Sequence, residues 1–286
     1  MIVQDVIKHL EELSPLAYAE DFDNVGLLVG DRNSAVTGIL VTLDTLEEVV
    51  DEALQNNCNL IVSFHPIIFT GIKKITGKTY VERVILKAIQ HGISIFSIHT
   101  ALDNSNVGVN NMICEKLDLI NREILIPKNN TIKKLSTYVP KKEAEDLRNA
   151  LFKAGAGHIG NYSNCSFNSE GIGTYRGNEA SNPSIGKRGE THYEEEVQVS
   201  MIYPMDAEQK ILSTLFETHS YEEIAYEVTT LENPNQNIGM GMMGELKNEH
   251  DEQSFLYGVK TTFNCEIIRH SPLLDKPIRK VAVLGG

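Results

Sequence analysis

The sequence predicts an α/β protein whose main sheet is parallel or mixed and flanked by helices, interrupted by a smaller α+β domain. Two observations carry this prediction. In the first part of the chain, short apolar runs typical of buried strands alternate with segments of helical hydrophobic period. After about residue 126 the composition changes and a second series of such patterns begins. We therefore expect a main domain formed by 1–126 and 238–286, with 127–237 as an insertion.

The main domain is expected to open with a helix, because the apolar residues between Ile2 and Leu13 share one helical face. Strands that alternate with helices over short connections run parallel, through right-handed crossovers. In such sheets the loops at the carboxyl ends of the strands carry the chemistry. The elements expected after the opening helix are, in chain order, a strand at 39–43, a helix at 46–54, a strand at 60–62, a helix at 81–89 and a strand at 93–98.

The insertion is expected to begin after a linker-like segment at 126–131. A Gly-rich segment at 155–189 is interpreted as a mobile surface loop, in preference to a backbone ligand site. The order of elements resembles a small ferredoxin-like module. Near residue 238 the chain is expected to return to the main domain and to finish with a strand at 281–284. The expected elements of the insertion are a strand at 136–140, a helix at 143–154, a strand at 195–202, a helix at 207–217 and a strand at 224–229.

The composition excludes several classes of protein. The chain carries 26 Lys and Arg against 39 Asp and Glu, a formal charge of −13, which disfavours nucleic acid as a partner. Its four cysteines form no C-x-x-C pair, so neither a disulfide framework nor a thiolate zinc site is indicated. No apolar stretch approaches the roughly 20 residues that span a bilayer. We expect a soluble cytoplasmic protein without a membrane partner.

Each of the three expected parallel strands leads to a side chain that can bind metal or move protons. Asp44 follows the first strand, His65 the second, and His99 the third, with Asp103 four positions later. Carboxyl ends of adjacent parallel strands share one edge, so these groups are expected to face one crevice, with Asp44 as the less certain member. Imidazole and carboxylate donors suit zinc, manganese, iron or cobalt. The competing interpretation is a hydrogen-bonded buried histidine at position 65 and a turn at Asp103.

Other motifs in the sequence do not indicate a binding or catalytic site. Two G-x-G-x-x-G matches, at 155–160 and 239–244, are rejected as dinucleotide sites because neither follows a strand and opens a helix. Gly155 is instead expected to end the preceding helix in a left-handed conformation. The acidic run at 194–196 is interpreted as a solvated strand edge, and 219–223 as a loop between helix and strand.

Several strings resemble the GTP cyclohydrolase 1 type 2 homologue family, also called Nif-three-like. They cover essentially the whole chain in the same order. Two further segments, at 155–167 and 219–226, resemble the additional domain of longer family members. The matching strings are EDFDNVGLLVG at 20–30, NLIVSFHPIIF at 59–69, GIKK at 71–74, HTALD at 99–103 and VAVLGG at 281–286.

The resemblance implies a Nif-three-like main domain split by a ferredoxin-like, PII- or CutA-like domain. It also implies two divalent metal ions per subunit and a toroidal homohexamer. By position, His65 and Asp103 would be metal ligands, and His99 would lie at the site as the catalytic proton shuttle. Two departures are expected to weaken the site. Phe64 stands where the family has a histidine, and the family's later His-x-x-x-Glu pair has no counterpart before Gly286, as in a C-terminally truncated relative.

The leading hypothesis is therefore a divalent-metal-dependent hydrolase of the GTP cyclohydrolase class, opening the ring of a purine nucleotide with zinc, manganese or iron. The alternative is a non-catalytic toroid that binds metal or ligand and serves regulation. A ring that threads DNA would fit the toroid but not the charge of −13.

Overall fold

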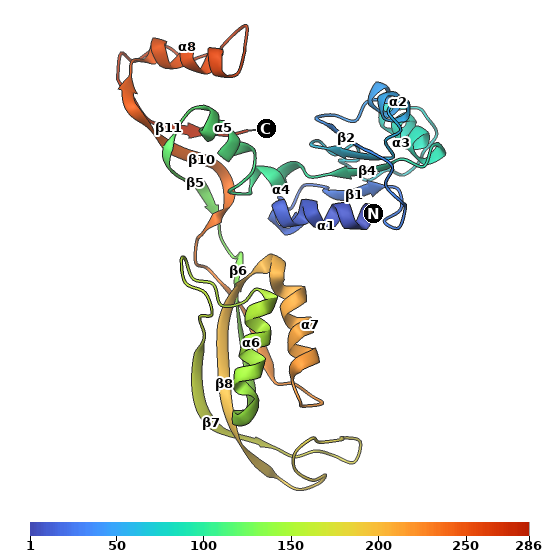
Figure 1. Cartoon of the computed structure of the whole chain (residues 1–286), viewed down its shortest axis with the longest axis vertical. Coiled ribbons are helices and arrows are strands. Elements are labelled where there is room, and N and C mark those ends of the chain that lie inside the picture. The colour runs from blue at the N-terminus through green and yellow to red at the C-terminus, as the bar shows by residue number, and fades with distance from the viewer. Residues whose placement is uncertain (286) are drawn as a thin grey trace. The chain divides into compact units, whose positions relative to one another are not determined.

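A computed structural model describes residues 1–285 as two compact units (Figure 1). Unit 1 contains Met1–Pro127 and the chain from Gln236 onward, and unit 2 contains Lys128–Asn235. Gly286, the last residue of the string at 281–286 that resembles the family, lies outside the described residues. No helix in residues 1–285 has the length and apolar character needed to cross a membrane.

The first sheet of unit 1 is mixed, with the strand order β1-β4-β3-β2. Strands β2, β3 and β4 are parallel, as the sequence predicts. Strand β1 pairs antiparallel with β4 and was not expected, because it follows a polar turn and its pairing with a distant strand leaves no local pattern. The elements of this part are α1 (Val3–Leu13), β1 (Gly26–Val29), β2 (Ile39–Thr42), α2 (Glu47–Gln55), β3 (Leu60–Ser63), α3 (Tyr80–Gln90), β4 (Ser94–Ser97) and α4 (His99–Asp103).

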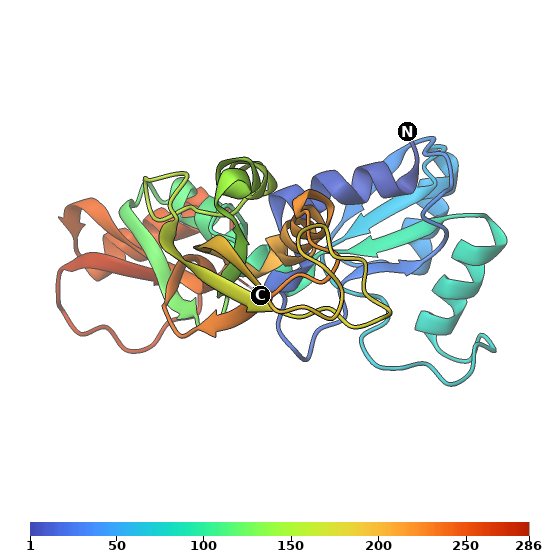
Figure 2. The same ribbon diagram turned by 90° about the horizontal axis from the view of Figure 1, so that it is seen from below.

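Helices cover both faces of this sheet, which explains why its central strands are continuous apolar runs (Figure 2). Every residue of β3 and β4 is buried. Ile61 and Ile95 pack with α2 and α3, whereas Leu60 and Phe96 pack with α1 on the opposite face. Successive strand residues point to opposite faces, so this double cover fixes the register of the strands and the position of their carboxyl ends.

A second sheet completes unit 1, with the strand order β11-β10-β5. Its small core includes Cys114, Leu119 and Met242. Residues 126–128, expected as part of a linker, belong to β5, and the polar segment before Gly239 belongs to β10. Many residues of both strands are exposed, so the sequence there lacks the apolar pattern that predicts a buried strand. The elements are α5 (Val109–Lys116), β5 (Ile120–Lys128), β10 (Asn235–His250), α8 (Glu252–Thr262) and β11 (Ile278–Val283).

Unit 2 is an antiparallel sheet with the strand order β7-β8-β6-β9 and two helices packed on one face. Leu135 and Val199 of the sheet pack against Leu151 of α6 and Leu215 of α7. Strands β6 and β9 pair along their length, so that Ile132 lies opposite Leu231. The elements are β6 (Ile132–Pro140), α6 (Ala144–Ala154), β7 (Phe167–Tyr175), β8 (His192–Pro204), α7 (Glu208–Thr218) and β9 (Tyr226–Leu231).

Two expectations for unit 2 were wrong. The segment 155–189 is not simply a loop, because it contains β7, whose mostly exposed residues gave no strand signal. The acidic run 194–196 is not a solvated edge, because β8 lies between β7 and β6 and Glu196 is only 9% exposed. Gly155 does end α6 in the left-handed region, with φ 115°, as the sequence predicts.

Candidate metal centre

The two candidate histidines lie at the carboxyl ends of neighbouring parallel strands. His65 follows β3 and His99 follows β4, and the paired strand ends, Ser63 and Ser97, fix their spacing. The ring centroids of His65 and His99 are 5.5 Å apart. The structure therefore brings together the two imidazoles that the sequence places on separate strands.

Asp44 orients the first imidazole. Its Oδ1 lies 2.8 Å from Nδ1 of His65, and both side chains are about half exposed. The carboxylate favours the tautomer with the proton on Nδ1, which leaves Nε2 of His65 as the atom able to bind a metal. Asp44, a less certain candidate from the sequence, thus contacts a candidate ligand through its Oδ1.

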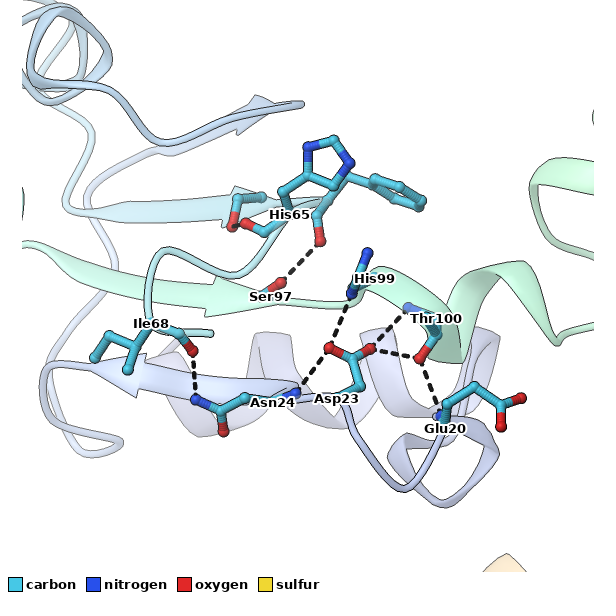
Figure 3. A network of polar contacts seen from close by, with 10 residues as sticks. Glu20, Asp23, Asn24, His65, Ile68, Ser97, His99 and Thr100 are labelled. Carbon is cyan, nitrogen blue, oxygen red and sulfur yellow. Dashed lines mark hydrogen bonds and ion pairs between the residues drawn. The ribbon is translucent and has the colours of Figure 1, made fainter. Parts of the chain in front are cut away.

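Asp23 orients the imidazole of His99, and this pair is more deeply buried than the pair of Asp44 and His65. Its Oδ1 lies 2.8 Å from Nδ1 of His99, and the Asp23 side chain is fully buried (Figure 3). Thr100 donates to Asp23 from its backbone N–H at 3.1 Å and also from its hydroxyl, and the Asn24 N–H donates at 2.7 Å. Burial by itself would raise the pKa of Asp23, but the hydrogen bonds from His99, Thr100 and Asn24 outweigh it and lower the pKa.

Asp23 is the functional residue that sequence reasoning missed. It lies in a polar turn before β1, and it reaches His99 only because β1 pairs antiparallel with β4. The one signal was the polar string at 20–24 directly before an apolar run. That string belongs to the family resemblance, but nothing in its spacing connects it to position 99.

The backbone of His99 is itself unusual. Its φ is +27°, a positive value that residues other than glycine rarely adopt. The conformation is held from two sides, since the His99 N–H donates to the carbonyl of Phe64 at 3.0 Å and the ring is held by Asp23. Strain of this kind is retained where the surrounding structure fixes a side chain in one orientation.

Asp103 supplies a carboxyl oxygen, Oδ1, that has no hydrogen-bond partner among residues 1–285. It ends α4, it is 8% exposed, and no group among the described residues donates to its buried Oδ1. Burial raises the pKa of Asp103 to about 6, with His99 and His65 acting against the shift and the nearby Asp23 carboxylate adding to it. A buried acceptor left unpaired is costly, so this oxygen is suited to a cation.

Phe64 forms an apolar wall beside the histidines. Its ring meets His65 edge-on with centroids 5.1 Å apart and His99 with centroids 5.4 Å apart. It offers no donor atom to a metal, which is the consequence expected from the sequence.

The donors present fit a divalent cation in their chemistry but form an incomplete set. Among residues 1–285, no group of three or more His, Cys, Asp or Glu side chains is arranged to hold a metal ion. Catalytic zinc sites use three protein ligands. The fit instead rests on two features: imidazoles whose Nδ1 atoms are held by carboxylates, and the unpaired Oδ1 of Asp103.

Comparison with known sequences identifies the family. A sequence model of Duf34/NIF3 (NGG1p interacting factor 3) matches residues 1–286. The chain belongs to the Duf34/NIF3 family. A Bacillus subtilis relative named GTP cyclohydrolase 1 type 2 homolog is 39% identical over 284 residues, covering 99% of this chain and 76% of the relative. A Listeria monocytogenes relative of the same name is 36% identical, covering 97% of this chain and 75% of the relative.

Two solved structures share the fold. The crystal structure of a Bacillus cereus protein related to NIF3 matches with a TM-score of 0.85 and 38% identity, covering 100% of this chain and 77% of that one. A Staphylococcus aureus protein matches with a TM-score of 0.72 and 29% identity, covering 100% of this chain and 75% of that one. The resemblance expected from the sequence is thereby confirmed.

Proposed function

We propose that this Duf34/NIF3 protein is a divalent-metal-dependent hydrolase that opens the ring of a purine nucleotide. The observation that carries the proposal is the buried Asp103 carboxyl, with an unpaired oxygen beside two imidazoles that carboxylates hold in place. The names of the relatives support the substrate class, since they are called GTP cyclohydrolase 1 type 2 homologs.

His65, through Nε2, and Asp103, through Oδ1, would hold the cation. When bound, a divalent cation acts as a Lewis acid and makes water acidic enough to serve as a nucleophile near neutral pH. Zinc, manganese and iron all suit these donors. These two donors are one fewer than the three protein ligands of catalytic zinc sites, so the proposal requires a further ligand from outside this set besides the position for water or substrate.

His99 would move the proton. Asp23 fixes the proton on Nδ1, so that Nε2 of His99 is free to accept a proton from water and return it to the leaving nitrogen. The same carboxylate stabilises the imidazolium that forms in between. Phe64 and Phe69 stand edge-on to the His99 ring and limit the approach of water from their side.

The proposal extends to the insertion and the assembly. The β-α-β-β-α-β order of unit 2 and its β7-β8-β6-β9 sheet support a ferredoxin-like fold of the PII or CutA kind. By family resemblance we further propose a homohexameric toroid in the cytoplasm. Size-exclusion chromatography with light scattering tests the assembly, and a monomeric mass would contradict it.

The test of the function measures metal content and GTP consumption on the same preparation. We expect the chain to bind zinc or manganese and to consume GTP, and Asp103→Asn to lose both. Asp21→Asn, an exposed carboxylate in the turn that holds Asp23, is the matched control and should change neither. Metal binding without GTP consumption would favour the alternative, a non-catalytic regulator. Unchanged metal content in Asp103→Asn would contradict the site itself.

A further inference from the structure

Unit 2 contains a cavity of about 820 Å³ that the proposed function does not use. It lies on the sheet face opposite α6 and α7: Val197 and Val199 of β8 point into the helix-covered core, while Glu196 and Gln198 point the other way and line the cavity. The segments that follow β7 and α7 close its sides. Its volume lies within the range of small-molecule sites.

Two glycines of β7 create the hollow. Gly171 lies opposite Glu196 in the sheet, and a side chain added there would meet no atom within 4 Å. At Gly173, in contrast, a Cβ would collide with the carboxylate of Glu196. The absence of a side chain at Gly171 therefore leaves the hollow open. Its absence at Gly173 leaves room for the Glu196 carboxylate. Neither position has a positive φ, so the need for glycine here is one of space.

Glu196 is a buried carboxylate with spare hydrogen-bonding capacity. Its side chain accepts a hydrogen bond from the hydroxyl of Tyr221 at Oε1, 2.8 Å away. Burial, together with that bond, raises the pKa of Tyr221, so the phenol remains a donor. No hydrogen bond among the described residues engages Oε2 of Glu196. One neutral donor is little compensation for a carboxylate that is 9% exposed.

The lining combines negative charge with aromatic rings. Four carboxylates line the cavity against one cation, Arg176, and of these four only Glu170 has an ion-pair partner among the described residues, Lys141 at 2.8 Å. The rings of Tyr175 and Tyr221 meet edge to face with centroids 5.7 Å apart. Aromatic faces and carboxylates attract the same kind of ligand, a cation with an apolar body.

We propose that this cavity binds a small organic ammonium ion, with the ammonium group at Oε2 of Glu196 and its apolar body against Tyr175 and Tyr221. The charge of the lining opposes a free phosphate or carboxylate ligand. The site lies within unit 2 alone, so it stands independently of the proposed metal centre in unit 1.

Isothermal titration calorimetry on the 286-residue chain tests the site with three probes of similar shape: 2-phenylethylamine, 2-phenylethanol and 3-phenylpropanoate. We expect saturable binding of the amine, with the alcohol and the acid at least about tenfold weaker because they lack the charge-assisted hydrogen bond. Absence of amine binding at millimolar concentration, or equal binding of the acid, would overturn the proposal.

Variants locate the site. Glu196→Gln keeps the shape and the acceptor for Tyr221 but removes the charge, and should weaken amine binding about tenfold or more. Glu195→Gln, the exposed neighbour outside the cavity, changes the net charge equally and should have less than about a twofold effect. Gly171→Leu fills the hollow and should abolish binding. Circular dichroism checks its folding, and if it does not fold, the Glu196 and Glu195 pair decides: equal affinities would overturn the proposal.

Discussion

Asp23 Oδ1 lies 2.8 Å from Nδ1 of His99, a contact between residues 76 positions apart. The pairing of β1 with β4 makes it, since Gly26 of β1 lies opposite Ser97 of β4, two residues before His99. An antiparallel strand added to a parallel sheet thus delivers a buried carboxylate to the edge where the parallel strands end. The orientation of His99 depends on that strand.

Replacing Asp23 by asparagine should therefore release the His99 ring. We expect Asp23→Asn to shift His99 away from the Nδ1–H tautomer, which ¹⁵N NMR of the imidazole reads directly, and to slow GTP consumption by about 10–100-fold because His99 moves the proton. Asp21→Asn is the control, since Asp21 is exposed in the same turn. A tautomer unchanged in Asp23→Asn would disprove the orienting role whether or not metal binds.

Asp103 should make the metal-free protein less stable as the pH rises. The pKa of Asp103 is about 6 in the folded chain against 3.8 for the unfolded group, so the folded state binds the proton more tightly. The stability that this proton provides is complete below about pH 4 and lost as the pH rises through 6. The loss is worth about 2–3 kcal/mol.

Asp103→Asn removes this effect. In the presence of a chelator, we expect the variant to be about 2 kcal/mol more stable than the parent at pH 8 and to lose that advantage at pH 4, as measured by urea unfolding. A variant that is less stable than the parent at pH 8 would contradict this prediction, because it would show that the protein stabilises the ionised Asp103 carboxylate.

Gly30 should tolerate no side chain. Its φ is +108°, and a Cβ there would lie 2.7 Å from the Cα of Ser94 in β4. Strain and overpacking together predict that Gly30→Ala costs about 2–4 kcal/mol of unfolding free energy. Gly92→Ala, at φ +66° with open space around it, should cost only about 1 kcal/mol. Equal costs for the two variants would mean that β1 and β4 can separate at Gly30.

Glu82 should stabilise α3 in a pH-dependent way. Hydrogen bonds from the backbone and hydroxyl of Thr76, then from Lys78 and Thr79, lower its pKa from 4.5 to about 2. Because the folded pKa is the lower one, the stabilisation is present above about pH 4.5 and lost as the pH falls toward 2. We expect Glu82→Gln to lower the thermal midpoint at pH 7 and to converge with the parent near pH 2. Glu48→Gln, exposed on α2, should show no such convergence.

The elements that the sequence predicts best are those whose pattern of apolar residues follows their burial in the fold. Strands β3 and β4 are covered on both faces and appear as unbroken apolar runs, and the apolar faces of α1 and α3 repeat at helical spacing. Strand β7 escaped prediction because its residues are largely exposed and include Gly171 and Gly173. Its existence depends on pairing with β8 across a long connection, which no local pattern encodes.

The same reason separates the predicted from the missed parts of the site. His65 and His99 could be placed together because parallel strands carry their carboxyl ends to one edge. Asp23 could not, because it lies in the turn before β1, and β1 pairs antiparallel with β4. Glu196 was assigned to solvent because charged runs usually lie there, and only the pairing of β8 on both sides shows that its carboxylate is enclosed.

The pairing of Ile132 with Leu231 makes the two ends of unit 2 neighbours. In unit 1, the strands that lead out and back, β5 and β10, are also adjacent in their sheet. A segment whose entry and exit points adjoin adds little loop-closure entropy to its host, even when it spans Lys128–Asn235. The junction is equivalent to a β-hairpin whose turn has been replaced by a domain. The chain therefore enters and leaves unit 2 along neighbouring strands, and the register of each sheet is set within its own unit.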